Sequence, residues 1–454
     1  MMRSPESIAE SVAEVRDSFT GDVLGPSDLE YERARLCFNL LIDRRPAAIA
    51  RCADAGDAAT ALAFAREHDL EIAVRGGGHN PAGHCVVDDG LVIDLSRMRR
   101  VEVDPDARLA RSEGGATWLD FDAATHSHGL VTPGGVVGST GVAGLALGGG
   151  IGHLTAQYGF TCDNLVAAEL VTPAAEVVHV NGDEAPDLLW GIRGGGGNFG
   201  VATQLTFRLH PLWTVVGGRL EYAGDGVREA LRTFRDVDAI ADDDLSCQAQ
   251  LTVDEAMNPA LTVAPCYTGT EEDPEEYRAL RSAPGLVSDG VRRHGFLDQQ
   301  RVFDPGYGID RNYWKGHFVR ELPDQLIDLL IDSMGALGRP PGAVLIESLR
   351  GAPKRIDPDG AALGYRGAAF NVSVMASWTN PALDDEHIAW ARETAAAIEP
   401  WSVGGGYANY MQADEPLERV RAAFGPKSFD RLRVLKSRYD PANALHRNQN
   451  IPPL

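Results

Sequence analysis

Short runs of apolar and β-branched residues, separated by glycine-rich or polar turns, dominate the first half of the chain. This pattern predicts β-strands rather than long helices. The strands are expected at 71–74, 91–95, 108–112, 165–171, 176–180 and 203–209. A helix-like run beginning at Asp57 precedes the first strand, and an amphipathic pattern from Ile8 to Phe19 predicts a helix near the N-terminus.

The pattern changes after His210-Pro211, where longer periodic runs alternate with apolar strands. Helices are expected at 227–237, 324–337 and 384–398, and strands at 219–222, 248–253, 343–347 and 370–378. The change predicts a domain boundary near residue 212. The stretch from Tyr407 to Leu454 is again rich in Asn, Tyr and Pro, so we expect it to return to the first domain.

Composition and charge exclude several function classes. None of the apolar runs among the 454 residues approaches the ~20 residues of a membrane helix, and the N-terminus lacks the apolar core of a secretory signal. A net charge of −23 argues against a nucleic-acid partner. Six scattered cysteines without a C-x-x-C pair are typical of a cytoplasmic protein and argue against a structural zinc site. We expect no metal, because His79 and His84 have no partner set of Asp, Glu or Cys at metal-ligand spacing. The acidic surface fits either a GC-rich genome or a halophilic source.

The loop from Arg75 to Cys85, Arg-Gly-Gly-Gly-His-Asn-Pro-Ala-Gly-His-Cys, is the most informative segment. Three consecutive glycines cost backbone entropy wherever they lie. A backbone that closely approaches a ligand, such as a pyrophosphate bound by main-chain N–H groups, explains them. The alternative interpretation is a glycine-rich turn that carries an incidental His79.

Two further glycine clusters lie at 133–152 and 193–201. Neither is a Rossmann fingerprint, which must follow a strand and open a helix, and the chain has no Gly-Lys-Ser/Thr phosphate loop. Three clusters between residues 75 and 201 indicate an elongated ligand held between closely packed backbones. A dinucleotide bound outside the Rossmann scheme fits this pattern, and glycines that serve only tight packing are the alternative.

The ordered motifs resemble those of berberine bridge enzyme-like flavoproteins of the vanillyl-alcohol oxidase (p-cresol methylhydroxylase) superfamily. They comprise residues 75–80, 141–152, 158–164, 187–201, 407–410 and 439–453. The resemblance implies an α+β fold with a two-subdomain FAD-binding domain of the p-cresol methylhydroxylase type over residues 1–212 (core about 45–212). It also implies a substrate domain at 213–405, with an antiparallel sheet covered by helices, and a C-terminal segment, 406–454, that returns to the FAD-binding domain.

The same resemblance implies FAD held by one covalent link. His79 occupies the position of the histidine that is bonded to the flavin 8α-carbon in the family. Val137 stands where many members carry a second, cysteinyl link, and Cys162 lies too far along the motif to replace it. The other implied cofactor contacts are Arg75, Gly76, Gly77, Gly78, Asn80, Ser139, Gly141, Val142, Gly144, Leu145, Gly149, Ile151, Val201, Tyr407 and Asn409.

Tyr410 is our leading catalytic candidate, because its position resembles that of the family's proton acceptor. That residue takes a proton from the substrate as a substrate hydride goes to the flavin. A free tyrosine titrates near ~10, so such a base needs help from its surroundings. Glu347, in the apolar strand Val344–Leu349, is the alternative base. Weaker candidates for the substrate face are His153, Tyr365, Arg366 and Asn371.

The sequence thus predicts an FAD-dependent oxidase acting on an alcohol, phenol, amine or sugar hydroxyl, with O2 as acceptor. The alternative that the protein is a dehydrogenase with another acceptor stays open, since the resemblance places Leu165 where residue size gates oxygen access in the family. A redox-neutral cyclase or a flavin-binding protein is the alternative from another class. The expected partners are O2 and a bulky organic molecule of secondary metabolism, bound by a monomer or homodimer.

Overall fold

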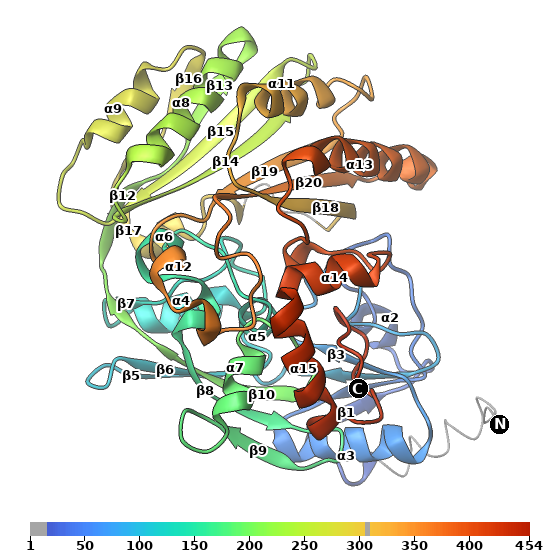
Figure 1. Ribbon diagram of the computed structural model, residues 1–454. Helices are drawn as coiled ribbons and strands as arrows, with labels where there is room; N and C mark the ends of the chain where they lie inside the picture. The colour runs from blue at the N-terminus through green and yellow to red at the C-terminus, as the bar shows by residue number, and fades with distance from the viewer. Residues whose placement is uncertain (1–15, 305–308) are drawn as a thin grey trace.

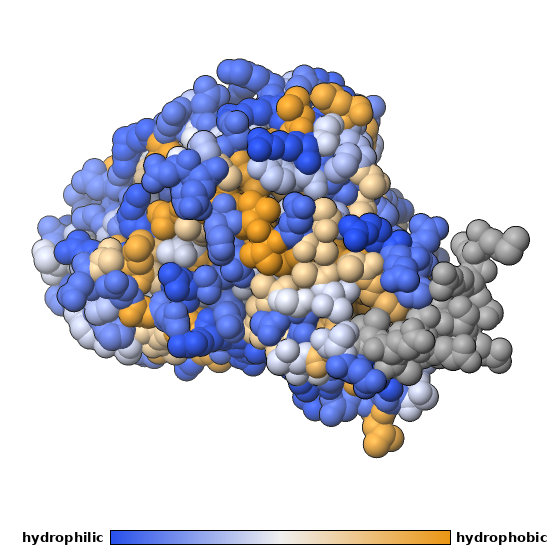
Figure 2. Space-filling model, turned by 90° about the horizontal axis from the view of Figure 1, so that it is seen from below, coloured by the Kyte–Doolittle hydropathy of each residue, from blue (hydrophilic) through white to orange (hydrophobic). Residues whose placement is uncertain are grey.

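The computed structural model describes residues 16–304 and 309–454 and divides them into two halves (Figure 1). A four-stranded and a five-stranded sheet dominate the lower half in this view, and a large sheet covered by helices forms the upper half. Most of the N-terminal helix expected at 8–19 lies outside the described residues. The face seen from below is largely hydrophilic (Figure 2), as the net charge of −23 leads one to expect.

A four-stranded sheet positions the first glycine loop. Its order is β1-β2-β4-β3, with β2 and β3 both parallel to β4. The strands are β1 (Asp22–Leu24), β2 (Ala48–Arg51), β3 (Ile72–Arg75) and β4 (Leu91–Asp94). Helix α3 (Ala55–Glu67), capped by the Asp54 side chain, connects β2 to β3. The glycine loop therefore starts at the carboxyl end of a parallel strand, where ligands of open α/β sheets bind.

An antiparallel five-stranded sheet carries the other glycine clusters and has the order β5-β6-β10-β8-β9. Its strands are β5 (Val101–Asp104), β6 (Leu109–Glu113), β8 (Leu165–Val171), β9 (Val177–Val180) and β10 (Val201–Arg208). Its core also takes residues from α4 (Trp118–His126), α5 (Val142–Leu147), α7 (Pro186–Ile192), α14 (Leu417–Phe424) and α15 (Pro426–Tyr439). The last two helices belong to the C-terminal segment, shown in red beside the lower half in Figure 1.

A buried ion pair fastens α15 to the third glycine cluster. The Lys436 ammonium lies 2.7 Å from the Asp440 carboxylate, and both side chains are fully buried. Lys436 also donates to the carbonyl oxygens of Asn198 at 2.8 Å and Leu445 at 2.9 Å. Asp440 accepts backbone N–H groups of Ala444 and Leu445. Both charges are therefore paired and hydrogen-bonded, which burial of an ion pair requires.

The upper half is built on a nine-stranded sheet with the main order β16-β13-β15-β14-β19-β20-β18, to which β12 and β17 are attached. The strands are β12 (Thr214–Gly217), β13 (Leu220–Ala223), β14 (Leu245–Val253), β15 (Pro259–Tyr267), β16 (Leu286–Asp289), β17 (Arg292–Gly295), β18 (Arg311–Val319), β19 (Gly342–Ser348) and β20 (Phe370–Trp378). Helices α8 (Val227–Ile240), α9 (Glu275–Ser282), α11 (Asp324–Ser333) and α13 (Asp384–Ile398) cover one face and bury a large apolar core.

The opposite face of this sheet points toward the lower half. Because side chains alternate along a strand, Ala249 and Leu251 of β14 enter the helix-covered core, whereas Gln248 and Gln250 point the other way.

The short elements are α2 (Tyr31–Ala34), β7 (Leu130–Val131), α6 (Thr155–Tyr158), β11 (His210–Pro211), α10 (Phe296–Gln299) and α12 (Ala352–Arg355). In the described ranges no helix is long and apolar enough to cross a membrane.

Most of the expected elements are present, with shifted ends. The helix expected at 324–337 ends at Ser333, and the one expected at 227–237 continues to Ile240. Among the elements that the sequence analysis did not predict are β15, β18, α14 and α15. All four carry polar residues or proline within their spans, which obscures the periodicity from which elements are predicted.

We predict that Lys436→Met lowers the free energy of unfolding by about 3–5 kcal/mol, because Asp440 keeps a buried charge without its partner. The control is Lys427→Met on the same helix, where the ion pair with Asp359 spans 3.8 Å and both side chains are exposed. That change should cost about 0–1 kcal/mol. Denaturant unfolding and FAD retention of both variants check this. Equal losses in the two variants would contradict the anchoring role of Lys436.

Candidate active site

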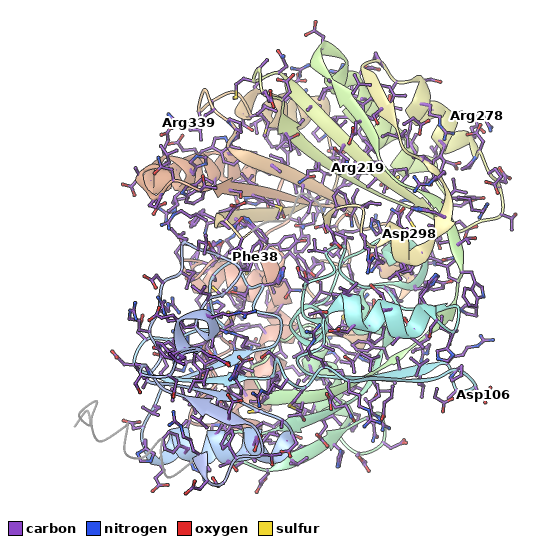
Figure 3. The ribbon with its side chains drawn as sticks, turned by 180° about the vertical axis from the view of Figure 1, so that it is seen from behind. Phe38, Asp106, Arg219, Arg278, Asp298 and Arg339 are labelled. Atoms are coloured by element: carbon purple, nitrogen blue, oxygen red, sulfur yellow. The ribbon has the colours of Figure 1, made fainter. Side chains whose placement is uncertain are left out.

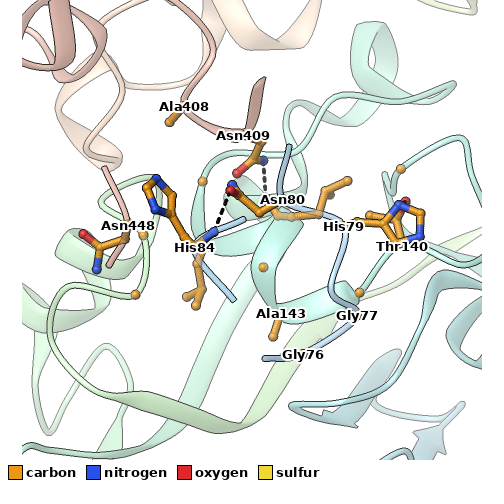
Figure 4. A pocket seen from close by; sticks show the side chains of 18 of the residues that line it. Gly76, Gly77, His79, Asn80, His84, Thr140, Ala143, Ala408, Asn409 and Asn448 are labelled. Carbon is orange, nitrogen blue, oxygen red and sulfur yellow. Dashed lines mark hydrogen bonds between the residues drawn. The ribbon is translucent and has the colours of Figure 1, made fainter. Parts of the chain in front are cut away.

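A cavity lies between the two halves and is lined by three distant parts of the chain. One wall consists of the glycine clusters, and the facing wall is the uncovered face of the large sheet. The C-terminal segment completes it with Tyr407–Tyr410 and Arg447–Gln449. Figure 4 shows Gly76, Gly77 and His79 of the first cluster close to Thr140 and Ala143 of the second.

The first two glycine clusters press backbone against backbone. A Cβ atom on Gly77 would lie 2.3 Å from the amide nitrogen of Gly141, and one on Gly141 would lie 2.4 Å from that of Gly77. Any side chain at either position would push the loops apart. Gly78, at the next position, has a φ of +71°, a conformation that favours glycine.

Other glycines serve to keep the cavity open, and not to let two loops approach each other closely. A Cβ on Gly144 or Gly197 would meet no atom within 4 Å, and both residues line the cavity. In addition, the N–H groups of residues 77–80 donate to no acceptor within the described part of the chain. A row of main-chain donors without an acceptor on a cavity wall suits an anionic ligand. This wall fits the phosphates of FAD.

The structure brings most of the sequence-predicted site residues to the cavity, and the others lie behind its wall. Lining residues from that set are Gly76, Gly77, Gly78, His79, Asn80, Gly141, Gly144, Leu145, Ile151, Tyr407, Asn409 and Tyr410. Arg75 instead donates to the carbonyl oxygens of Ala34 and Arg35 and braces the loop. Ser139 contacts His79, Gly149 packs near the Tyr365 hydroxyl, and Val142 and Val201 lie in apolar cores.

The His79 ring is fixed from two sides. It stacks on Phe38 with ring centroids 4.7 Å apart and an interplanar angle of 15°. Its Nε2 lies 3.0 Å from Ser139 Oγ, and its Nδ1 lies 3.4 Å from Thr140 Oγ1. Burial lowers the pKa of His79 to about 4. The imidazole is therefore neutral near pH 7 and keeps a nitrogen lone pair.

Two cysteines bear on the possible number of covalent links. Cys162 lies in an apolar core, away from the cavity lining, whereas Val137 lines the cavity. Cys85 also lines it, which the sequence analysis did not anticipate. Contact with the Cys37 thiol and burial raise the pKa of Cys85 well above its usual value, so this thiol is a poor nucleophile at neutral pH.

Tyr410 and Glu347, which the sequence analysis treated as alternatives, form one hydrogen-bonded pair. The Tyr410 hydroxyl donates to Glu347 Oε1 over 3.4 Å, and the Asn371 amide donates to Oε2 over 2.6 Å. Glu347 is only 1% exposed. Burial raises the pKa of this carboxyl to about 7, against the opposing effect of the hydrogen bonds from Asn371 and Tyr410. A carboxyl group with such a pKa can exchange a proton at neutral pH.

A chain of aromatic rings connects His79 to Tyr410. Phe38 packs edge-on against Trp314 with centroids 5.8 Å apart, and Trp314 packs edge-on against Tyr410 at 5.4 Å. Tyr407 lies 4.7 Å from Tyr410 on the other side. Figure 3 places Phe38 at the junction of the two halves. The rings therefore hold the two sides of the cavity in a fixed relation.

Several lining residues were missed, and some weaker candidates lie elsewhere. The missed ones are Phe38 beside His79, and His84, Gln248, Gln250, Phe303, Trp314, Leu345, Met375, Arg447, Asn448 and Gln449 in the lining. Glutamines at alternate positions of an apolar strand were the signal that could have found Gln248 and Gln250.

Three of the weaker candidates, Tyr365, Arg366 and His153, do not line the cavity. Tyr365 stacks on Phe318, Arg366 pairs with Asp163, and His153 stacks on Phe303. Leu165 is likewise buried outside the lining of the cavity, in the core of the five-stranded sheet.

The described residues contain no group of three or more His, Cys, Asp or Glu side chains that could hold a metal ion.

The raised pKa of Glu347 predicts a pH-dependent stability. Its folded-state pKa of about 7 exceeds the ordinary 4.5, so the folded protein binds the proton more tightly than the unfolded chain. The contribution of this group to the free energy of unfolding is fully present below pH ~4.5 and is lost as the pH rises through ~7. The total loss is about 3 kcal/mol. Glu347→Gln should remove this loss. Denaturant unfolding of both proteins at pH 5 and pH 8 measures it, and parallel pH profiles would contradict it.

Comparisons with known proteins agree with this architecture. A family described as FAD binding domain matches residues 46–181, and one described as berberine and berberine like matches residues 406–452. The chain is 30% identical over 453 residues to (R)-6-hydroxynicotine oxidase of Paenarthrobacter nicotinovorans, covering 96% of this chain and 97% of that protein. It is also 30% identical over 452 residues to an FAD-linked oxidoreductase of Dictyostelium discoideum, covering 98% and 97%.

Solved structures share the fold. The crystal structure of 6-hydroxy-D-nicotine oxidase from Arthrobacter nicotinovorans matches with a TM-score of 0.86 and 28% identity, over 96% of this chain and 98% of that one. The wild-type BBE-like 1 protein of Physcomitrella patens matches with a TM-score of 0.86 and 21% identity, over 98% and 99%. The chain therefore belongs to the berberine bridge enzyme-like family of FAD-linked oxidoreductases, and it has the α+β fold of the p-cresol methylhydroxylase superfamily.

Proposed function

We propose that the protein is an oxidase that removes a hydride and a proton from an alcohol, phenol, amine or sugar-type substrate, with O2 as the final acceptor. The observation that carries this proposal is the Tyr410–Glu347 pair, a buried proton acceptor beside a cavity that fits FAD. Residues 1–212 and 406–454 together hold the cofactor, and residues 213–405 supply the substrate face.

The glycine wall holds the cofactor. The N–H groups of residues 77–80, which have no acceptor among the described residues, bind phosphate oxygens, while Gly144 and Gly197 leave room for the ligand. When bound, FAD supplies the two-electron acceptor that none of the protein side chains can provide.

His79 is the covalent attachment point for the flavin 8α-carbon. Its neutral imidazole has the lone pair that such a bond requires, and contacts from Phe38 and Ser139 hold the ring in place. Val137 offers no sulfur on the same wall, and the raised pKa of Cys85 disfavours attack by that thiol. A single link follows.

Tyr410 and Glu347 move the substrate proton in two connected transfers. Tyr410 Oη accepts the proton from the substrate O–H or N–H and passes its own proton to Glu347 Oε1, 3.4 Å away. Because the pKa of Glu347 is about 7, a large fraction of the carboxyl is ionised near neutral pH and can accept. The Asn371 amide holds the carboxylate in the orientation that faces Tyr410.

A dehydrogenase would use the same groups and pass electrons to another acceptor, and a redox-neutral flavoprotein would use the cavity without net oxidation. An aerobic peroxide assay over a panel of alcohols, phenols, amines and sugars tests the proposal. Substrate-dependent peroxide supports the oxidase. Flavin reduction without peroxide would indicate a dehydrogenase, and no reduction by any compound would contradict the oxidoreductive proposal for these substrate classes.

We predict that His79→Ala abolishes the covalent attachment of FAD, because the variant lacks the imidazole nitrogen that is proposed to bond to the flavin. Intact-mass analysis should show one FAD adduct on the wild-type protein and none on the variant, whose flavin should separate on acid precipitation. An adduct retained in the variant, or a flavin-bearing cysteine peptide from the wild type, would refute the single His79 link.

We predict that Tyr410→Phe slows anaerobic flavin reduction by ~10²–10⁴-fold, the usual cost of losing a general base. The substrate for this assay is one that the peroxide panel identifies, and covalent loading should stay intact. Tyr365→Phe is the matched control, because this buried tyrosine belongs to the neighbouring aromatic cluster but does not line the cavity. Its reduction rate should change less than ~3-fold. Unchanged reduction in Tyr410→Phe would instead assign the base to Glu347 alone.

A further inference from the structure

Two of the six cysteines, Cys37 and Cys85, form a pair of free thiols beside the cavity. They belong to one apolar cluster, and their thiols hydrogen-bond to each other. The Cys37 Sγ also lies 3.5 Å from the carbonyl oxygen of Asn39, and the Cys85 Sγ lies 3.9 Å from that of Gly78. Two sulfurs that the fold holds in contact have only to approach to about 2 Å to form an S–S bond.

This pair is also the least sealed of the cysteines. Cys37 is 7% exposed and Cys85 is 5% exposed. The other four are sealed more completely, at 3% for Cys247 and 0% for Cys52, Cys162 and Cys266. Because Cys85 lines the cavity, a small oxidant such as hydrogen peroxide has access to the pair from that side.

The groups around the pair make Cys37 the nucleophile. The hydrogen bond from Cys85 lowers the pKa of Cys37 below its usual value, against the effect of burial. The backbone of Asn39 and the guanidinium groups of Arg75 and Arg44 lower this pKa further. A thiolate beside a positive charge is the reactive form of cysteine. Burial instead raises the pKa of the four other cysteines, which therefore stay protonated.

The pair lies where the segment 37–44 runs along the first glycine loop. The Phe38 N–H donates to the Gly78 carbonyl oxygen over 3.1 Å, and the Arg44 guanidinium donates to the carbonyl oxygen of Val86 over 2.9 Å. The Phe38 ring covers the ring of His79. All of these contacts are noncovalent, so a disulfide in the pair would join the two segments covalently beside His79.

We propose that Cys37 and Cys85 are a redox-active pair that hydrogen peroxide oxidises to a disulfide. The bond ties the segment that carries Phe38 to the loop that carries His79. The chemistry of the pair does not depend on the proposed function. Only a local source of the oxidant does, because peroxide is the reduced form of O2 that the proposed oxidase releases.

The oxidation takes place in two steps. The Cys37 thiolate attacks one oxygen of hydrogen peroxide and the O–O bond breaks, which leaves a sulfenic acid on Cys37 and a hydroxide that takes up a proton to form water. The Cys85 sulfur then attacks the Cys37 sulfur, the S–O bond breaks, and the leaving hydroxide forms a second water with the proton of the Cys85 thiol. The two thiols lose two electrons in all, and the peroxide gains them.

The first step prepares Cys85 for the second. The largest effect that raises the pKa of Cys85 is its hydrogen bond to Cys37, followed by burial. The effect of the Cys37 thiolate ends when this sulfur becomes an uncharged sulfenic acid, whereas Arg75 continues to lower the pKa of Cys85. Cys85 is therefore a poor nucleophile in the reduced pair and a better one once a sulfenic acid lies beside it.

The test counts the thiols of the wild-type holoenzyme. The reduced protein, freed of reductant, is treated with hydrogen peroxide, denatured and alkylated with N-ethylmaleimide before its intact mass is measured. The number of adducts should fall from six to four, because two of the six cysteines become bonded. Peptide mapping should show Cys37 linked to Cys85, and dithiothreitol should restore six adducts. This measurement does not depend on the folding of any variant.

The near-isosteric Cys85→Ser variant should stop the reaction after its first step. Dimedone, which labels sulfenic acids, should then modify Cys37, and no linked peptide should form. Cys247→Ser is the matched control, because Cys247 is also buried and lies near a second cysteine, Cys266, on the adjacent strand. This variant has one cysteine fewer, and its adducts should still fall by two.

The tether has a readout of its own. A cross-link restricts the unfolded chain, so peroxide should raise the denaturant midpoint of the wild-type protein, and dithiothreitol should reverse the rise. The midpoint of Cys85→Ser should not rise with peroxide. A linked pair without a higher midpoint in the wild-type protein would overturn the tethering role.

Two further outcomes overturn the proposal. Six adducts after peroxide treatment, or losses at the other four cysteines in place of the pair, would show that the pair is not the reactive site. Dimedone labelling of Cys37 in the wild-type protein without a linked peptide would show that Cys85 does not complete the reaction. Because the peroxide is added, these results are independent of the oxidase proposal, whose failure appears as absent peroxide in the substrate panel.

Discussion

The geometry of the active site depends on the hydrogen bonds of one buried side chain, Asn39. Its amide nitrogen donates to the carbonyl oxygens of Pro81 and Asn312, both at 2.7 Å. Its oxygen accepts the backbone N–H groups of Leu41 at 3.0 Å and Asn312 at 2.8 Å. One fully satisfied amide thus links the glycine loop that carries His79 to β18, the strand that carries Trp314.

This link explains how residues from distant segments reach one cavity. With Asn39 fixed, its neighbour Phe38 lies between the His79 ring and the Trp314 ring. Trp314 in turn packs against Tyr410, so His79 and Tyr410, the proposed attachment point and the proposed proton acceptor, are related through rigid rings. Buried polar networks of this kind rigidify a structure only when every member is paired, and Asn39 meets that condition. Lys436 has the same effect at the other end, where it joins α15 to the loop of Asn198.

The fold class and the cofactor were predicted from the resemblance of the ordered motifs to a known family, and the glycine clusters by themselves indicated an elongated ligand because glycine acts through its own backbone. Gly77 and Gly141 are required by a contact that no other residue allows, so their meaning can be read without a structure. The apolar run around Glu347 predicted a strand but left open whether the carboxylate points outward, and the structure buries both faces of that strand. The helix α15 was missed because Lys436, fully buried, interrupts its apolar stripe where a hydrophobic residue is expected.

The arrangement of the site was not predictable in the same way, because it depends on register. The pairing of Gln248 with Glu347, and of Glu347 with Asn371, follows from how β14, β19 and β20 align, and the hydrophobic pattern of each strand alone does not give that alignment. The Tyr410–Glu347 hydrogen bond also joins residues 63 positions apart, across the two halves. Two candidates that compete in the sequence are therefore partners in the structure.

The two walls of the cavity share one physical property, which is that each keeps hydrogen-bonding groups without partners among the residues that the structure describes. On the glycine wall these are backbone N–H groups, and on the sheet wall they are the Gln248 amide and the Trp314 indole N–H. Leaving them unpaired costs stability in the free protein, and any ligand that pairs them stabilises the folded state by mass action. The glycine wall offers only donors and so selects an anion, whereas the sheet wall offers a donor and an acceptor beside a titratable acid. The difference between the walls thus supports the proposal that the phosphates of FAD bind on one side and a neutral, proton-donating substrate on the other.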